Sequence, residues 1–263
     1  MGAIGWITKD GREISFEEAR AIARKEGAFE KFPISTLVAM EETRNDGYWL
    51  SPSSATYCNR QRILKRENDY YQDLEGSWTS FTGTAYHGEL ARQRIPGLLY
   101  EQHLSIPLSV QLRDGTETAF TLQGTADLYD EDQRSLYDWK TIGDFQYYDA
   151  STKTRTNRVL PDPSHVLQIN LYALMLRWKG FPVEHAYIWY VKSEGKKGVP
   201  RKLVEVELWE MEDTYHLACD LAEPLAFSEK CGILPQEQYD PTLYMCQSCP
   251  VQALCRELAG QGK

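Results

Sequence analysis

Three segments with alternating apolar and polar residues lie between residues 98 and 141, and they constrain the fold more than any other part of the sequence. Residues 98–112 alternate, Asp114-Gly115 is typical of a hairpin turn, and residues 119–129 and 135–141 repeat the alternation. Strands joined by such short turns pair antiparallel, because a parallel connection needs a crossover of a dozen or more residues. The sequence therefore predicts a meander of three antiparallel strands.

Helical patterns flank these strands. Residues 82–94 have helical spacing, residues 165–179 follow Ser164 as a predicted N-cap, and residues 210–230 form a third helical stretch that contains Pro224. Further strands are predicted at residues 183–192 and 202–209. We expect an α/β fold with a mixed central sheet flanked by helices. Residues 1–45 are predicted to form an N-terminal helical extension, and residues 46–263 a single domain.

Charge and hydropathy limit the partners. The net charge is −9, from 29 basic and 38 acidic residues, which argues against a chain that coats nucleic acid through bulk charge. A local basic groove is still compatible with this charge, although a solvated surface explains the same residues: Lys153, Arg155, Arg158, Lys192, Lys196 and Lys197.

No segment approaches the roughly 20 apolar residues of a membrane span. The first ten residues lack a basic region followed by an apolar run, so they do not resemble a secretory signal. We therefore expect no membrane partner and a cytoplasmic location, in the host cytoplasm if the protein is encoded by a virus.

Two carboxylates and one lysine are predicted to meet in the meander. Asp138 and Lys140 point to the same side of their strand, and a short hairpin places Asp127 beside Asp138. Two like charges about 4 Å apart repel by roughly 4 kcal/mol at an effective dielectric of 20, and a divalent cation removes this conflict. Oxygen ligands suit Mg²⁺ or Mn²⁺. The alternative is a pair of surface carboxylates with a neighbouring lysine, because Asp-x-Lys is a common tripeptide.

Four short motifs occur in a fixed order along the chain. They are Gly83-Thr84-x-x-His87, Gly124-Thr125-Ala126-Asp127, Asp138-Trp139-Lys140-Thr141 and Gln168-x-x-x-Tyr172. In this order, residues 50–258 resemble the PD-(D/E)XK nuclease superfamily in its RecB-like branch, which has a restriction-endonuclease-like core. Each motif is weak alone, and their order on the expected elements makes the resemblance specific.

The resemblance implies a role for each matching residue. The metal ligands would be His87, Asp127, Asp138 and the backbone carbonyl of Trp139, with Glu101 as an additional candidate. Lys140 would position the attacking water. Gln168 and Tyr172 lie one helical turn apart and would contact the scissile region or support Lys140. The alternatives are a hydrogen-bonded helix histidine at His87, an exposed glutamate at Glu101 and a polar helix rim at Gln168.

The chain has six cysteines, three of which lie near its end as Cys246-x-x-Cys249-x5-Cys255. A tetrahedral site needs a fourth ligand, and spacing alone fits zinc as well as iron–sulfur. The resemblance extends to the iron–sulfur members of the branch, the AddB nuclease domain and the CRISPR-associated exonucleases of the fourth Cas family. It implies a 4Fe–4S cluster on Cys58, Cys246, Cys249 and Cys255 that staples the N-terminal and C-terminal parts together. Zinc and free thiols are the alternatives.

The resemblance implies a divalent-metal-dependent DNA exonuclease that acts on single-stranded DNA or DNA ends, in recombination, repair or viral DNA processing. One alternative is a CRISPR-adaptation nuclease that trims spacer precursors with an integrase partner. Another is a non-catalytic iron–sulfur subunit that binds DNA, which the intact Asp127, Asp138 and Lys140 disfavour. The sequence contains no Gly-x4-Gly-Lys-Ser/Thr phosphate loop, so a helicase, like a recombinase, would be a separate partner.

Overall fold

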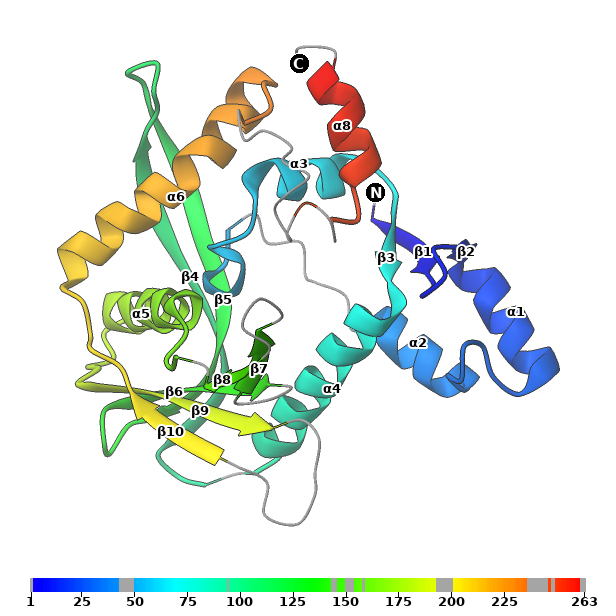
Figure 1. The fold of residues 1–263 in the computed structure, drawn as a ribbon. Helices are drawn as coiled ribbons and strands as arrows, with labels where there is room; N and C mark the ends of the chain where they lie inside the picture. Colours follow the sequence, from blue (N-terminus) through cyan, green and yellow to red (C-terminus); the bar gives the residue numbers. More distant parts are fainter. Residues whose placement is uncertain are drawn as a thin grey trace. The chain divides into compact units, whose positions relative to one another are not determined.

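The computed structural model describes residues 2–42, 50–93, 95–142, 146–149, 154–157, 159–192, 201–235, 246 and 249–260. The chain forms two compact units. The first contains Met1–Gly47, Tyr57–Thr84 and Pro224–Lys263, and the second contains Tyr48–Thr56 and Ala85–Glu223. Figure 1 draws both, coloured along the sequence. Each unit is therefore assembled from segments that are far apart in the chain.

The second unit is built on a five-stranded sheet in the order β10-β9-β6-β5-β4. Strands β4, β5 and β6 form the predicted antiparallel meander, whereas β9 pairs parallel with β6 and antiparallel with β10. The sheet is therefore mixed, as the sequence predicts. Its strands are β4 (Leu98–Gln111), β5 (Glu117–Asp130), β6 (Ser135–Ile142), β9 (His185–Lys192) and β10 (Arg201–Glu205). A separate hairpin joins β7 (Gln146–Asp149) to β8 (Thr154–Asn157).

The long hairpin of β4 and β5 follows from its alternating sequence and one turn. The apolar residues at every second position from Leu104 to Val110 are buried, and the residues between them are exposed. Gly115 has a φ of 82°, in the left-handed region that glycine adopts without strain. Pairing continues through Pro107, which lies opposite Thr121, so the proline does not end the strand.

Helix α5 (Pro163–Trp178) packs against strands β4, β6 and β9, and every residue from Gln168 to Leu176 is buried (Figure 1). The sequence predicts Ser164 as its N-cap, but the cap is Asp162, whose Oδ1 accepts hydrogen bonds from Ser164 N at 2.9 Å and from Ser164 Oγ at 2.6 Å. Proline explains the difference, because Pro163 has no amide hydrogen and fits the first helical position.

Helix α6 (Met211–Cys231) contains Pro224 without ending there. Its first half is fastened to the β4–β5 hairpin by polar contacts. The hydroxyl of Tyr215 accepts a hydrogen bond from Ser109 N at 2.9 Å, and Glu223 forms an ion pair with Arg113 at 2.6 Å. A short 3-10 helix, η1 (Pro52–Ser54), also packs against α5 and β5.

The first unit contains a three-stranded sheet in the order β2-β1-β3. Strand β1 (Ala3–Ile7) pairs antiparallel with β2 (Glu13–Ser15) and parallel with β3 (Tyr70–Asp73). The sequence predicts only helices in residues 1–45, so strands β1 and β2 differ from the prediction. They are too short to show a clear alternation, and β1 pairs with a partner far along the chain.

The helices of the first unit surround this sheet or follow it. Helix α1 (Phe16–Glu26) begins at the predicted cap Ser15, whose Oγ accepts a hydrogen bond from Glu18 N at 3.2 Å. Helix α2 (Ile34–Glu42) contributes Leu37 and Met40 to the core. Helix α3 (Asn59–Glu67) packs against α8 (Gln252–Gly260). Helix α4 (Leu74–Ala91) begins in the first unit and ends in the second. None of the described helices is long and apolar enough to cross a membrane.

Trp6→Ala should strongly destabilise the first unit. Trp6 is 1% exposed and its ring packs edge-on against Phe16, with 4.7 Å between centroids. Truncating a buried aromatic residue costs about 3–5 kcal/mol, and Ile4→Ala, at an exposed position of the same strand, should cost at most about 0.5 kcal/mol. Urea unfolding followed by tryptophan-independent circular dichroism measures both. Equal losses of stability would contradict this description of the core.

Candidate active site

Strands β5 and β6 stop pairing where the candidate site begins. The last paired residues are Leu128 and Tyr137, so Asp127 and Asp138 come next on the two strands. Asp127 Oδ2 instead accepts a hydrogen bond from the backbone N–H of Trp139 at 2.7 Å. The Asp127 side chain thus accepts the hydrogen bond from a backbone N–H at the point where the strands cease to pair. The two aspartates lie side by side, as the sequence predicts.

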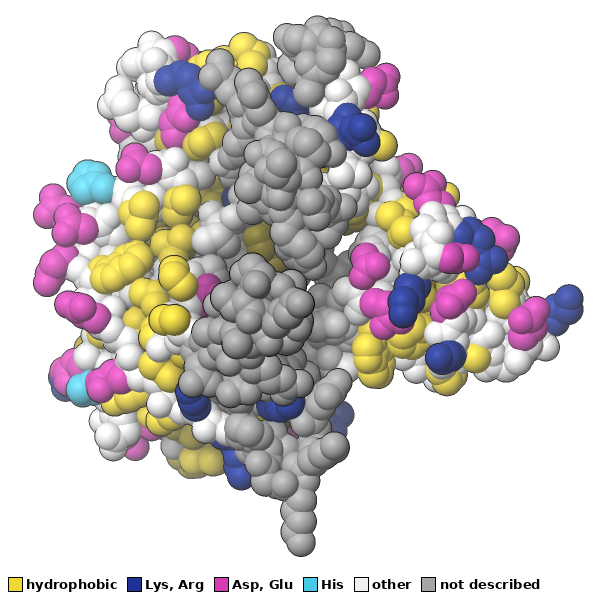
Figure 2. Space-filling view, in the orientation of Figure 1, with side chains coloured by type: hydrophobic (Ala, Val, Ile, Leu, Met, Phe, Trp, Pro, Cys, Tyr) yellow, Lys and Arg dark blue, Asp and Glu magenta, His cyan; other side chains and the backbone are white. Residues whose placement is uncertain are grey.

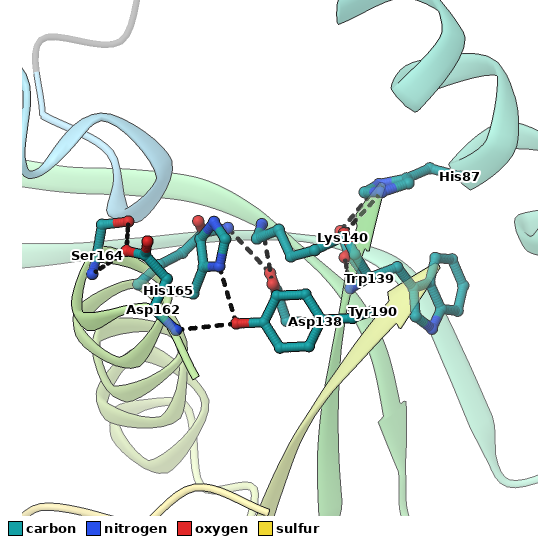
Figure 3. Close-up of polar contacts among 10 residues, drawn as sticks. His87, Asp138, Trp139, Lys140, Asp162, Ser164, His165 and Tyr190 are labelled. Carbon is teal, nitrogen blue, oxygen red and sulfur yellow. Dashed lines mark hydrogen bonds and ion pairs between the residues drawn. The ribbon is translucent and has the colours of Figure 1, made fainter. Parts of the chain in front are cut away.

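His87, Glu101 and Asp127 form a group that could hold a metal ion. They come from α4, β4 and β5, and one ligand atom of each lies within 4.8 Å of the other two. His87 Nδ1 is 3.3 Å from Asp127 Oδ1, and His87 Nε2 is 3.0 Å from the carbonyl oxygen of Trp139. The backbone carbonyl predicted as a ligand is therefore beside this group (Figure 3).

Both ring nitrogens of His87 face groups that can only accept a hydrogen bond. Burial lowers the pKa of His87, but the hydrogen bond and the charge of Asp127 raise it, and the net effect is an increase. A doubly protonated imidazole matches these contacts. A protonated His87 ring places a positive charge next to the Asp127 carboxylate.

Glu101 lies at an irregular point of the β4–β5 ladder. Tyr100 pairs with Leu128 and Gln102 with Ala126, but Glu101 and Asp127 between them are not paired. The φ of Glu101 is 46°, a left-handed conformation that costs a non-glycine residue about 1–3 kcal/mol. Such strain persists only where the surrounding structure enforces it, and here it turns the carboxylate toward His87.

The Glu101 carboxylate has two properties that suit a metal ligand. Burial raises its pKa first, and the charge of Asp127 raises it further, whereas His87 lowers it. Among the residues that the structure describes, its buried Oε1 has no hydrogen-bond partner. A buried acceptor without a partner is costly, and a divalent ion would satisfy it. The residues present therefore fit a Mg²⁺ or Mn²⁺ ion.

Asp138 is almost completely buried, with both oxygens facing side-chain donors. Lys140 Nζ lies 2.8 Å from its Oδ2, and Gln168 Nε2 donates to its Oδ1 at 2.9 Å. Burial is the main cause that raises the pKa of Asp138 to about 6, because the opposing charge of Lys140 compensates only in part. Asp138 is a predicted metal ligand, yet the close group of potential ligands contains Glu101 and not Asp138.

Tyr172 packs so closely against position 124 that this position favours glycine. Tyr172 is buried, and a Cβ atom added to Gly124 would lie 3.0 Å from its Cε1 atom. A backbone hydrogen bond from Thr125 reaches the Tyr172 hydroxyl, and burial, followed by the charge of Asp138, raises the pKa of this tyrosine. The glycine of the Gly124-Thr125-Ala126-Asp127 motif therefore makes room for the tyrosine of the Gln168-x-x-x-Tyr172 motif.

A second polar group lies at the start of α5, around His165, which belongs to none of the four sequence motifs. The Tyr190 hydroxyl is 2.9 Å from His165 Nδ1 and 3.2 Å from Asp162 N (Figure 3). His165 precedes Gln168 by three residues, and this spacing is the signal in the sequence. Its partner could not be predicted, because Tyr190 reaches the site only through the parallel pairing of β9 with β6.

The predicted DNA-binding cations are only partly described. Lys192 ends β9 and is half-buried, and Arg155 lies in β8, of which the backbone is described. Lys153, Arg158, Lys196 and Lys197 lie outside the described residues. On the face in Figure 2, the described lysines and arginines are scattered among acidic residues and do not form a continuous stripe.

The four cysteines assigned to a cluster all belong to the first unit. Cys58 precedes α3, and its Sγ accepts a hydrogen bond from Gln61 N at 3.4 Å. Burial raises the pKa of Cys249, as do Cys255 and Cys246, while a hydrogen bond from the Gln61 side chain lowers it. Within the described part of the chain, no three cysteine sulfurs lie within 4.8 Å of one another. Cys219 and Cys231 lie on α6.

A mixed sheet with acidic residues where its central strands separate, and a lysine two residues beyond one of them, defines a class of phosphodiester-cleaving proteins. Residues 40–256 match the family model of the PD-(D/E)XK nuclease superfamily. The chain belongs to this superfamily. No curated protein sequence matches it.

Two solved structures are similar to the chain. A crystal structure described as SSO0001 superposes with a TM-score of 0.50 and 12% identity, and the match covers 84% of this chain and 96% of that one. It supports the fold alone. A protein described as an exonuclease candidate from Eubacterium rectale has 11% identity and a TM-score of 0.34, with 87% and 82% of the two chains covered. This second superposition is too poor to argue from.

Asp138→Asn should gain stability relative to the wild type as the pH rises, in metal-free protein. Because burial raises the pKa of Asp138 from its ordinary value of 3.8 to about 6, the folded protein keeps a proton that the unfolded chain has released, and the wild type loses stability as the pH rises between these two values. Asparagine stays neutral and can still accept from Gln168. Between about pH 4 and pH 7, the difference in unfolding free energy should shift by roughly 1–3 kcal/mol toward the variant, with little further change at higher pH.

Urea unfolding with a chelator present measures this difference. The matched control is Asp132→Asn, because Asp132 is an exposed aspartate in the turn between β5 and β6. The control should show no comparable trend. A stability difference for Asp138→Asn that stays constant across this pH range would show that Asp138 is ionised without penalty.

Proposed function

We propose that the chain is a divalent-metal-dependent DNA exonuclease that hydrolyses phosphodiesters in single-stranded DNA or at DNA ends. The observation that carries this proposal is the convergence of His87, Glu101 and Asp127 next to the Asp138–Lys140 pair. Membership of the superfamily supports nuclease chemistry. The motif order supports the RecB-like branch and a role in recombination, repair or viral DNA processing.

His87, Glu101 and Asp127 would hold a Mg²⁺ or Mn²⁺ ion, with the Trp139 carbonyl and Asp138 as further ligands. When bound, such an ion polarises a phosphoryl oxygen and lowers the pKa of a coordinated water. The protein side chains position the lysine that would act with the ion. Asp138 fixes the Lys140 ammonium at 2.8 Å, and Gln168 fixes Asp138. Lys140 can then orient the attacking water and offset the charge that develops on the phosphate.

A 4Fe–4S cluster on Cys58, Cys246, Cys249 and Cys255 is part of the proposal. The Gln61–Cys249 hydrogen bond and the packing of α3 against α8 support it, because they bring the helix that follows Cys58 to the C-terminal cysteines. The cluster would tie the two segments together.

Cleavage should require Mg²⁺ or Mn²⁺ and the side chains of both Asp127 and Lys140. Asp127→Ala removes a metal ligand and the acceptor for Trp139 N, and Lys140→Ala removes the cation beside the phosphate. Each should lower cleavage of end-labelled single-stranded DNA by about a hundredfold or more. Lys202→Ala, on the exposed edge strand β10, is the control and should retain activity.

Covalently closed circular DNA separates the two modes of cleavage. An exonuclease needs an end, so the circle should resist while the linear form of the same sequence is degraded. Equal loss of both forms would replace the exonuclease with an endonuclease. Full activity of Asp127→Ala would move the active site elsewhere.

Purified without oxygen, the protein should be brown and contain about four iron and four sulfide ions per chain. Cys249→Ala should lose the colour and the iron, since Cys249 is the cysteine that both α3 and the other C-terminal cysteines approach. Cys231→Ala, an exposed cysteine at the end of α6, is the matched control and should keep both. A colourless protein with stoichiometric zinc would overturn the cluster.

A further inference from the structure

Aromatic side chains line the face of the central sheet that is turned away from α5, which we call the outer face. Paired residues of neighbouring strands share a face, as do residues two apart along one strand. Trp139 on β6 lies opposite Trp189 on β9, which lies opposite Leu203 on β10. Tyr137 and Tyr187 form another pair on this face, with their rings stacked 5.2 Å apart. Figure 3 shows the Trp139 ring pointing away from α5, so this row of residues belongs to the outer face.

The part of the outer face around Trp189 is accessible to solvent. Leu203 is 59% exposed, and Trp189 and Tyr86 are half-buried. The Tyr86 ring, from α4, lies 6.0 Å from the Trp189 ring at a tilt of 43°. Tyr86, Trp189 and Leu203 therefore form a contiguous apolar surface, the aromatic patch. Contiguous apolar surface on a soluble protein is a common feature of binding sites.

The aromatic patch is continuous with the candidate active site. The Trp139 ring lies 5.6 Å from the His87 ring, and Trp189 is the next residue across the sheet, one strand spacing of about 5 Å farther. Tyr86 precedes His87 in α4, so one helix supplies both a residue of the patch and a candidate metal ligand. A nucleic acid strand with one phosphate at the metal group can therefore place a nearby base against the Trp189 ring.

The charges on either side of the aromatic patch differ in sign. Arg201 and Glu205 are exposed, and they lie two residues to either side of Leu203 on the same face of β10. Burial raises the pKa of Tyr86, and the charge of the nearby Arg201 partly lowers it. Glu205 accepts a hydrogen bond from the Tyr187 hydroxyl at 3.5 Å. A polyanion is therefore attracted to the Arg201 end of the patch, where the guanidinium lies close to Tyr86, and repelled from the other end.

We propose that the aromatic patch binds an unstacked base of single-stranded DNA, with Arg201 at its rim contacting a backbone phosphate. This inference rests on the proposed nuclease function and adds to it a preference for single strands. Stacking on an aromatic side chain needs a free base face, which a single strand offers and a duplex does not. Every base has such a face, so the patch can hold strands of any sequence.

Trp189→Ala should weaken binding of a single-stranded oligonucleotide by roughly five- to a hundredfold, the range expected when an aromatic residue that stacks on a base is removed. Affinity for a duplex of the same sequence should change by less than about twofold, because its bases remain stacked on one another. Trp189→Phe keeps a ring and should retain most of the affinity. Trp178→Ala is the matched control, since it removes a tryptophan that is 43% exposed at the end of α5. Fluorescence anisotropy with a chelator present measures each Kd without cleavage.

The salt dependence of binding separates the base contact from the phosphate contact. Arg201→Ala should reduce the slope of log K against log salt concentration by about 0.7, because one fewer phosphate of the single strand is neutralised. Trp189→Ala should leave this slope unchanged, since stacking releases no counterions. A reduced slope for Trp189→Ala, or an unchanged slope for Arg201→Ala, would contradict the assigned contacts.

Oligonucleotides with one abasic position keep every phosphate and lack a single base. Wild-type protein should lose affinity when one particular base near the cleaved end is absent, and Trp189→Ala should be insensitive to the loss of that base. Melting curves confirm that each variant is folded. Wild-type binding that no abasic position weakens, or equal weakening of single-strand and duplex binding in Trp189→Ala, would overturn the base contact, and the patch would then fit a protein partner better. Wild-type protein that neither binds nor cleaves DNA would overturn the nuclease proposal as well.

Discussion

Three carboxylates, from Glu101, Asp127 and Asp138, are held close together in a largely buried site, and the rest of the site compensates for their repulsion. Two such charges about 4 Å apart cost roughly 4 kcal/mol at an effective dielectric of 20, which is a large part of the stability of a typical domain. Two features offset this cost. Asp127 accepts from Trp139 N, and the cationic groups of His87 and Lys140 each lie next to one carboxylate. Because the free energy required is large, the site can form only within a rigid sheet and helix framework.

The side chains on the two faces of β6 contact different parts of the site. Asp138 and Lys140 point toward α5, where Gln168 and the neighbouring Tyr190 fix the polar groups. The side chain of Trp139 points the other way, and its ring lies 5.6 Å from the ring of His87 in an edge-on arrangement. The backbone of the same residue links the faces, since its N–H contacts Asp127 and its carbonyl oxygen contacts His87. Three consecutive residues of a single strand thereby place a carboxyl group, a backbone carbonyl and an ammonium group in the site.

Local sequence patterns predicted the features that depend on local physics. Alternation and short turns predicted β4, β5 and β6, and helical spacing predicted α5. The spacing of Asp127, Asp138 and Lys140 was sufficient to place them together, because a hairpin fixes its register through its turn. The N-cap of α5 is Asp162 and not Ser164, because Pro163 has no amide hydrogen and fits the first helical position. Strand β1 and the Tyr190–His165 contact were not predictable, since each depends on a partner far away in the chain. Glu101 was predicted only as an additional ligand, because its left-handed backbone is imposed by the surrounding ladder and leaves no pattern in the sequence.

Protonation of the side chains reduces the repulsion between the carboxylates of the site. The contacts of His87 match a doubly protonated ring, and the pKa values of Glu101 and Asp138 are both raised, in each case with burial as the main cause. A cation that binds between these groups must displace the proton of His87 and favours the ionised form of each carboxyl. Metal binding and deprotonation are therefore one coupled equilibrium here. Burial disfavours the ionised forms of these carboxyl groups, and it would also strengthen their attraction to a divalent ion.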